Sequence, residues 1–80
     1  MKTSYPAYLM ELLKAQADGY TNDFLLDAEF NLYSANDPGI KYELFKCKFC
    51  FVALPSINAT LILVSTQSGV KGTLIDFYDY

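Results

Sequence analysis

The chain opens with apolar side chains at helical spacing. Between Thr3 and Gly19, apolar residues recur three and four positions apart, which places them on one side of a helix; they are Tyr5, Tyr8, Leu9, Leu12 and Leu13. Ser4 stands before Pro6 where an N-cap is expected, and Gly19 suits the left-handed residue that ends many helices. The pattern predicts one N-terminal helix over residues 3–19.

After Gly19 the period of the apolar positions shortens to two. Alternation over residues 21–27 predicts a strand, and residues 32–34 are its expected return partner in a hairpin. Residues 35–39 hold Asn, Asp, Pro and Gly together, a composition typical of a loop. A single helical turn is expected over residues 40–45.

The second half of the chain predicts three consecutive antiparallel strands, over residues 46–54, 60–66 and 70–78. Pro55 ends the first because proline has no N–H to donate, and Gly69 can supply the positive φ of the last hairpin turn. Gly72, inside the last strand, predicts either a bulge or an aromatic ring, Tyr20 or Tyr42, lying across it. The predicted fold is a single α+β domain over residues 1–80, with one N-terminal helix packed on a mainly antiparallel sheet of about five strands.

Composition limits the partners of such a domain. A length of 80 residues allows one domain, and 52% hydrophobic residues with 19% charged exclude a disordered chain. The net charge is −3, and all six basic residues are lysines. Because binding to nucleic acid or to an anionic membrane needs a basic surface, neither is expected as a partner.

The cysteines and the start of the chain bear on compartment and metal binding. Apolar runs are far shorter than the roughly 20 residues of a membrane span, and no signal segment follows Met1, so a cytoplasmic location with reduced cysteines is expected. Cys47 and Cys50 have the spacing of a redox pair or half a zinc site. In a strand, however, residues three apart point to opposite faces, and the chain has no histidine and no further cysteine. No metal and no cofactor are expected.

Two segments carry a resemblance to a known group of proteins. Gly19–Phe24 (GYTNDF) is similar to a GYTxDF segment, and Lys71–Asp76 (KGTLID), with Tyr78 after it, is similar to a KGTLVDAYG segment. Both recur in this order in small bacterial proteins of about this size, which are often named phosphoribosylpyrophosphate synthetases. Where that group has an aromatic-arginine-acidic segment and an aspartate-rich loop, this chain has Phe49–Val52 and Pro55–Ala59.

The chemistry of such a synthetase is nevertheless missing from the sequence. Phosphoryl-type transfer needs a phosphate cradle and positioned cations, whereas this chain has no G-x-x-x-x-G-K-[ST] loop, no arginine and no histidine. The spacings of Asp23 with Asp27 and of Asp76 with Asp79 could suit acid–base pairs, but nine carboxylates in 80 residues produce such spacings by chance. No catalytic residue is assigned, and a non-enzymatic domain is expected.

Two binding hypotheses remain, because one helix covers only one face of a sheet whose central strands are apolar on both sides. The first is a protein-interaction module that self-associates sheet to sheet as a homodimer. Its expected interface residues are Cys50, Val52, Leu54, Ile62, Val64, Tyr78 and Tyr80. The alternative is a small-molecule-binding or regulatory domain that uses the same uncovered face, rimmed by Tyr33, Tyr42 and Lys48.

Overall fold

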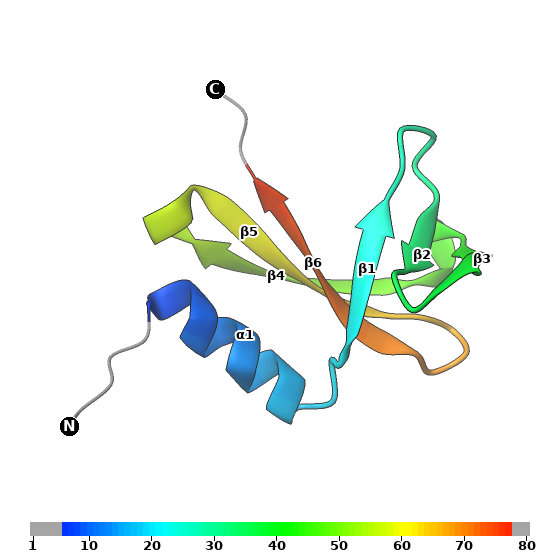
Figure 1. Cartoon of the computed structure of the whole chain (residues 1–80). Helices are drawn as coiled ribbons and strands as arrows, with labels where there is room; N and C mark the ends of the chain where they lie inside the picture. Colours follow the sequence, from blue (N-terminus) through cyan, green and yellow to red (C-terminus); the bar gives the residue numbers. More distant parts are fainter. Residues whose placement is uncertain (1–5, 78–80) are drawn as a thin grey trace.

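The computed structural model describes residues 6–77, which form one helix and six strands (Figure 1). These are α1 (Ala7–Ala17), β1 (Asn22–Leu26), β2 (Leu32–Ser34), β3 (Asp37–Tyr42), β4 (Lys48–Leu54), β5 (Ala59–Ser65) and β6 (Lys71–Phe77), with the short 3₁₀ turns η1 (Leu44–Lys46) and η2 (Pro55–Ile57). The strands make one sheet in the order β3-β2-β1-β6-β5-β4. The predicted α+β class is confirmed. Within residues 6–77, no helix has the length and apolar character that crossing a membrane requires.

The sheet consists of two antiparallel units joined side by side. β1, β2 and β3 form one unit and β4, β5 and β6 the other, and β1 runs parallel to β6 where the units meet. The expectation of about five mainly antiparallel strands therefore becomes a mixed sheet with six strands in the described part of the chain. The additional strand is β3, which contains Pro38 and Gly39 and was expected as a loop and a helical turn. An edge strand tolerates proline, because the outer N–H groups need no partner in the sheet.

α1 begins after Pro6, whose φ of −57° and ψ of 150° direct the chain into the first turn. Pro6 is the N-cap residue, so the predicted N-cap Ser4 and the helix start at residue 3 are wrong. The stripe residue Tyr5 lies outside the described residues. Gly19, with a φ of +96°, follows the last turn and confirms the predicted helix end. The side of α1 that packs on the sheet carries Tyr8, Leu12 and Ala15, whereas Leu13 of the predicted stripe is 45% exposed.

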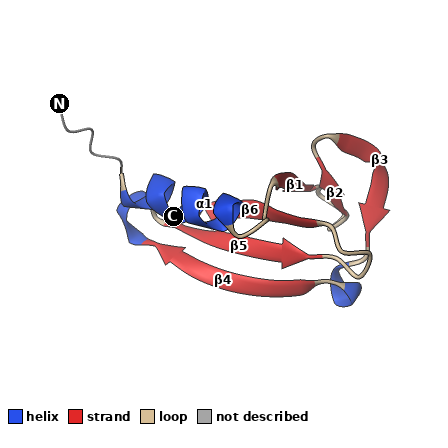
Figure 2. Ribbon diagram, turned by 90° about the horizontal axis from the view of Figure 1, so that it is seen from below, coloured by secondary structure: helices blue, strands red, loops and turns tan. Residues whose placement is uncertain are grey.

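Hydrophobic cores lie on both faces of the sheet. Under α1, the helix-side core buries Ala15, Leu54, Ala59 and Leu61. On the other face, the far-side core buries Phe24, Leu32 and Val64, with Tyr42 and Leu44 packed against it. Because side chains alternate along a strand, adjacent residues of β5 serve opposite cores. Figure 2 shows α1 near one end of the long strands and η1 at the other, and Leu44 of η1 packs against the far-side core.

Gly72 is the point where the two antiparallel units touch. A Cβ at this position would lie 2.6 Å from Cε2 of Phe24 and would also collide with the backbone oxygen of Asn22. The ring of Phe24 therefore covers the glycine, and the Tyr42 ring meets Phe24 edge-on at 5.8 Å and 83°. The predicted aromatic cover is present, but Phe24 supplies it, not Tyr20 or Tyr42. The alternative of a bulge is wrong, because β6 pairs with β5 in unbroken register from Lys71 to Phe77.

Replacing this glycine should destabilise the protein. Gly72→Val should lower the free energy of unfolding by about 1–3 kcal/mol through overpacking, although valine favours strands more than glycine does. The matched control is Gly39→Val on the β3 edge, where an added Cβ meets nothing within 4 Å. Urea denaturation followed by circular dichroism measures both. Equal midpoints for the two variants would contradict the close approach of β1 to Gly72.

The β1–β2 hairpin is held by one carboxylate. Oδ1 of Asp27 accepts hydrogen bonds from the backbone N–H groups of Glu29 and Asn31, each at 2.9 Å, and Oδ2 accepts from the Asn31 amide at 3.2 Å. The tip of this turn places Phe30 in the left-handed region, with a φ of 62°. Because bulky side chains rarely adopt that conformation, the Asp27 hydrogen bonds hold a strained turn in place.

The Asp27 carboxylate makes the stability of the hairpin dependent on pH. The hydrogen bond from the backbone of Asn31 lowers the pKa of Asp27 below its usual value. The contribution of the ionised Asp27 carboxylate to the free energy of unfolding is therefore complete above the pKa of Asp27 in the unfolded chain, about 3.9. This contribution is lost as the pH falls through the lower pKa of the folded state. Asp27→Asn should be less stable than the parent at neutral pH, and this difference in stability should become smaller in acid. Urea midpoints between neutral pH and about pH 3 test this. Glu29→Gln, in the same turn, is the control, and a gap that stays constant with pH would contradict the assignment.

Candidate functional site

The expected interface residues do not share one surface. Leu54 and Val64 are 2% and 0% exposed and belong to opposite cores, so neither is accessible to a partner. Val52 is half-buried in the helix-side core, Ile62 is half-buried in the far-side core, and Cys50 is exposed. Tyr78 and Tyr80 lie outside the described residues.

The side of β4 expected to be open is the side that α1 covers. Val52 and Leu54 pack into the helix-side core, and alternation places Cys50 on that side too, while Phe49 and Phe51 point away from the helix. The sequence could not decide between the sides, because both are apolar along this strand. The exposed apolar side of β4 is therefore the one that carries the phenylalanines.

These phenylalanines begin an apolar surface that crosses the sheet, here called the open row. In the register of the sheet, Phe51 lies opposite Ile62, and Ile62 lies opposite Leu74. Phe49 lies on the same side of β4 as Phe51 and extends this surface, and Phe51 is 67% exposed. The open row thus consists of Phe49, Phe51, Ile62 and Leu74 on the far side of the sheet.

The outer edge of β4 adjoins the open row. All seven residues of β4 pair with β5, from Lys48 with Ser65 to Leu54 with Ala59. Within residues 6–77, no strand pairs with the other edge. Soluble proteins usually protect such an edge with proline, bulges or charges, and β4 has only Lys48 at its start. The opposite sheet edge, β3, has Pro38, Gly39 and a register shift next to it. β4 is therefore the less protected of the two edges.

A second candidate surface lies at the η1 end of the sheet and is basic. Lys41, Lys46, Thr66 and Ser68 line a hollow of about 390 Å³, together with the Glu43 carboxylate. Lys46 and Lys48 line a neighbouring hollow of about 650 Å³ with Phe45 and Ser65. Lys46 also pairs with the Glu43 carboxylate at 3.0 Å. Three of the six basic residues of an acidic chain thus gather at one end.

The rim expected for a ligand site is only partly assembled. Tyr42 and Lys48 each line one of these two hollows, but the Tyr42 ring also packs against Phe24 in the far-side core. Tyr33 is half-buried in β2, where it pairs with Leu25. A ligand at this end of the sheet would therefore contact lysines and hydroxyl groups more than aromatic rings.

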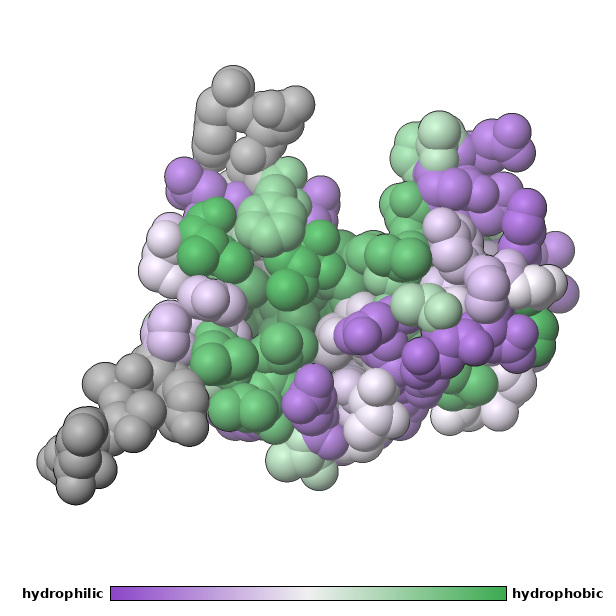
Figure 3. Space-filling view, in the orientation of Figure 1, coloured by the Kyte–Doolittle hydropathy of each residue, from purple (hydrophilic) through white to green (hydrophobic). Residues whose placement is uncertain are grey.

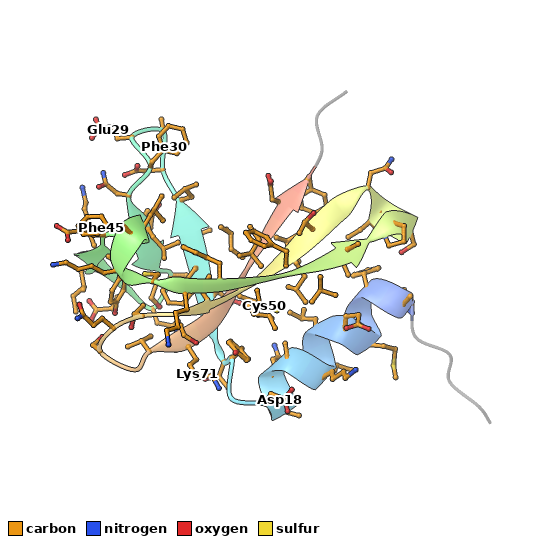
Figure 4. All side chains as sticks on the ribbon, turned by 180° about the vertical axis from the view of Figure 1, so that it is seen from behind. Asp18, Glu29, Phe30, Phe45, Cys50 and Lys71 are labelled. Carbon is orange, nitrogen blue, oxygen red and sulfur yellow. The ribbon has the colours of Figure 1, made fainter. Side chains whose placement is uncertain are left out.

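The two cysteines do not converge. Cys47 packs against the far-side core and its Sγ donates to the backbone oxygen of Glu43 at 3.5 Å, while Cys50 is exposed on the helix side (Figure 4). Burial raises the pKa of the Cys47 thiol. In residues 6–77, no group of three histidine, cysteine or carboxylate side chains is placed to hold a metal ion.

The segments that resemble the small bacterial proteins form the joint between the two halves of the sheet. Asn22 pairs with Gly72 and Asp23 with Thr73, and the Asn22 side-chain amide donates to the backbone oxygen of Lys71 at 2.9 Å. The two segments lie far apart in the sequence, so neither segment alone indicates that they touch. Their joint recurrence in the similar proteins is the one signal that could have suggested the contact.

Lys71 has structural partners as well. Its Nζ donates to the backbone oxygen of Asp18 at 3.0 Å and lies 4.2 Å from the centre of the Tyr20 ring (Figure 4). Lys71 thus closes the C-terminus of α1. Among the acidic residues, Asp27 is tied into its turn, Asp76 is exposed on β6, and Asp79 lies outside the described residues.

Comparison with known proteins adds no assignment. No family model matches the chain, and searches of curated proteins and of solved structures found no match. The surfaces described above are therefore the basis for a functional proposal.

The separation of the cysteines can be tested chemically. Cys50 should react with iodoacetamide at neutral pH much faster than Cys47, because Cys50 is exposed and the raised pKa of Cys47 leaves less reactive thiolate. Mass spectrometry of timed digests measures the two rates, and the single variants Cys47→Ser and Cys50→Ser assign them. Equal rates, or a disulfide that forms within the monomer under mild oxidation, would contradict the placement of the two sulfurs.

Proposed function

We propose that this protein is an interaction module that self-associates through the outer edge of β4. The observation that carries the proposal is the length of that edge: on one side, seven strand residues pair with no strand of residues 6–77, and the strand has no proline, glycine or bulge. An edge of this kind pairs readily with another strand through main-chain hydrogen bonds. The proposal assigns no enzymatic activity, in agreement with the absence of arginine and histidine from the chain.

The charge pattern of β4 favours a second copy in antiparallel orientation. Lys48 is the only charged residue of the strand and stands at its start. Antiparallel pairing about a two-fold axis near Phe51 places the two lysines at opposite ends, whereas parallel pairing would bring like charges together. The exposed Phe51 rings then meet at the axis, where aromatic pairs across strands are favourable. Such pairing also makes the open rows of the two copies continuous.

The resemblance to the small bacterial proteins has a structural explanation. We propose kinship with that group on the GYTNDF and KGTLID segments. Here those segments support a sheet joint through Asn22, Gly72 and Lys71. A shared structural joint explains the recurrence of both segments without requiring a shared catalytic reaction.

A small-molecule function is the second candidate, and the basic end of the sheet is the observation that favours it. Lys41, Lys46 and Lys48 stand around adjoining hollows that also expose hydroxyl groups, so a ligand there would be anionic. A thermal-shift series with inorganic phosphate, pyrophosphate and ATP addresses this candidate, with Lys46→Ala as the variant. A rise in the thermal midpoint of the parent that is absent in Lys46→Ala would support an anion site. No rise in the parent would contradict this candidate function.

Self-association is tested by sedimentation velocity at micromolar concentration. The parent chain should sediment as a dimer of twice 9.0 kDa, about 18 kDa. Phe51→Lys should be monomeric, because it places a charge at the centre of the paired edges. Phe30→Lys is the matched control: Phe30 is 69% exposed, similar to Phe51, but lies at the tip of the β1–β2 hairpin. This control should remain dimeric.

Another variant distinguishes edge pairing from packing of the two open rows face to face. Leu26 is exposed on the far side of β1, and β6 and β5 separate β1 from β4. Leu26→Lys should remain dimeric if the edges pair, and it should dissociate if the faces pack. A monomeric parent chain would overturn self-association, and a monomeric Leu26→Lys would overturn the edge geometry.

A further inference from the structure

One aromatic ring is available at the basic end of the sheet, where the rim of tyrosines is only partly assembled. Phe45 in η1 is 82% exposed, more than any other aromatic side chain of residues 6–77. Figure 4 shows it at the η1 end, away from α1. Because Phe45 belongs to neither core, packing within the chain does not account for a large aromatic side chain at this position.

Phe45 forms part of the wall of the larger hollow at this end. That hollow has a volume of about 650 Å³, and its other lining residues are Lys46, Lys48, Ser65, Thr66 and Gln67. The Nζ of Lys46 lies 5.7 Å from the centre of the Phe45 ring. Lys46, Thr66 and Gln67 also line the smaller hollow, so the two hollows adjoin. An aromatic ring and ammonium groups thus share one space.

The wall opposite η1 is held in place by hydrogen bonds. The Thr66 side chain is 7% exposed, and its hydroxyl accepts from the backbone N–H of Val70 at 3.0 Å. The same hydroxyl is 3.0 Å from the hydroxyl of Ser68. These contacts tie the β5–β6 turn together, so the hollow has one wall with a fixed shape.

The charges of the hollows determine which anion fits. On the face seen in Figure 3, hydrophilic side chains gather over the half of the molecule that carries β2 and β3, whereas hydrophobic ones gather around α1. The larger hollow is lined by two lysines and no carboxylate. The smaller one adds Lys41 and Glu43, so three lysines and one carboxylate again leave a charge of +2. A phosphate monoester carries a charge of about −1.5 to −2 near neutral pH and would neutralise this site.

The ion pair of Lys46 does not prevent anion binding. Lys46 and Glu43 are 3.0 Å apart, but their side chains are 53% and 57% exposed. Exposed ion pairs are weak, so Lys46 can turn from Glu43 to a bound phosphate. A triphosphate would fit less well, because it would bring further negative charge to a chain whose net charge is −3.

The exposed ring determines what the phosphate is attached to. A phenylalanine ring binds another flat ring by stacking, and nucleobases stack on aromatic side chains irrespective of their sequence identity. We infer that the η1 end of the sheet binds a nucleoside monophosphate, with its base stacked on Phe45 and its phosphate between Lys46 and Lys48. This inference rests on the anion site given above as the second candidate function, and it names the class of anion.

Calorimetry on the full chain tests the inference with three probes: AMP, adenosine and inorganic phosphate. AMP should bind at least about tenfold more tightly than either of the other two, because only AMP engages both the ring and the lysines. A second readout is tryptophan fluorescence. The chain has no tryptophan, so Phe45→Trp places a single reporter in the site. AMP should quench its emission, whereas inorganic phosphate should not.

Variants of the chain locate the binding. Phe45→Ala should weaken AMP binding by about tenfold, to the level of inorganic phosphate, and Phe45→Tyr should retain it because it keeps the ring. Phe30→Ala is the matched control, since Phe30 is 69% exposed and lines neither hollow. Lys48→Ala should weaken the binding of AMP and inorganic phosphate alike, whereas Lys14→Ala, at an exposed lysine of α1, should change neither.

The outcomes separate the nucleotide from the anion site. Inorganic phosphate that binds as tightly as AMP would leave the anion site in place and overturn the nucleotide inference. Equal AMP binding by Phe45→Ala and Phe30→Ala, or an emission of Phe45→Trp that AMP does not change, would overturn it as well. No binding of AMP or phosphate would overturn both.

Discussion

The contact between Gly72 and Phe24 is the constraint on which the rest of the structure depends. The two antiparallel units share only a short parallel pairing, and the absence of a side chain at Gly72 lets the backbone of β1 and the Phe24 ring approach. The far-side core is assembled across this joint, since Phe24 and Leu32 come from one unit and Val64 from the other. Burying that core therefore requires the joint, and the joint requires a glycine.

The same joint explains where the molecule remains open. Pairing stops after Asp23 and Thr73, so β1 and β6 separate and leave a notch inside the sheet. At the end of the sheet, β4 follows a regular register with β5 and keeps its outer edge free of any strand in the described part of the chain. The proposed self-association uses the free edge of β4.

Local chemistry made much of the fold predictable from the sequence. Gly19 ends the helix, Pro55 ends β4, and Gly69 supplies a φ of +92° in the last hairpin, because each of these effects depends on one residue and its neighbours. Contacts between distant segments were not predictable in this way. Strand β4 is apolar on both sides, so its pattern could not show which side α1 covers, and nothing local to Gly72 identified Phe24 as its cover. The candidate surfaces depend on these distant contacts, which is why the interface residues expected from the sequence were divided between two faces.

The most direct test is a nuclear Overhauser map of the β1–β6 boundary in the ¹³C,¹⁵N-labelled protein. The structure predicts strong contacts between the Hα protons of Gly72 and the ring protons of Phe24, with backbone contacts across the pairs Asn22–Gly72 and Asp23–Thr73. It also predicts that backbone contacts between the strands stop before Leu26 and Phe77. A ladder that continues to the ends of both strands, or the absence of contacts between Gly72 and Phe24, would contradict the account.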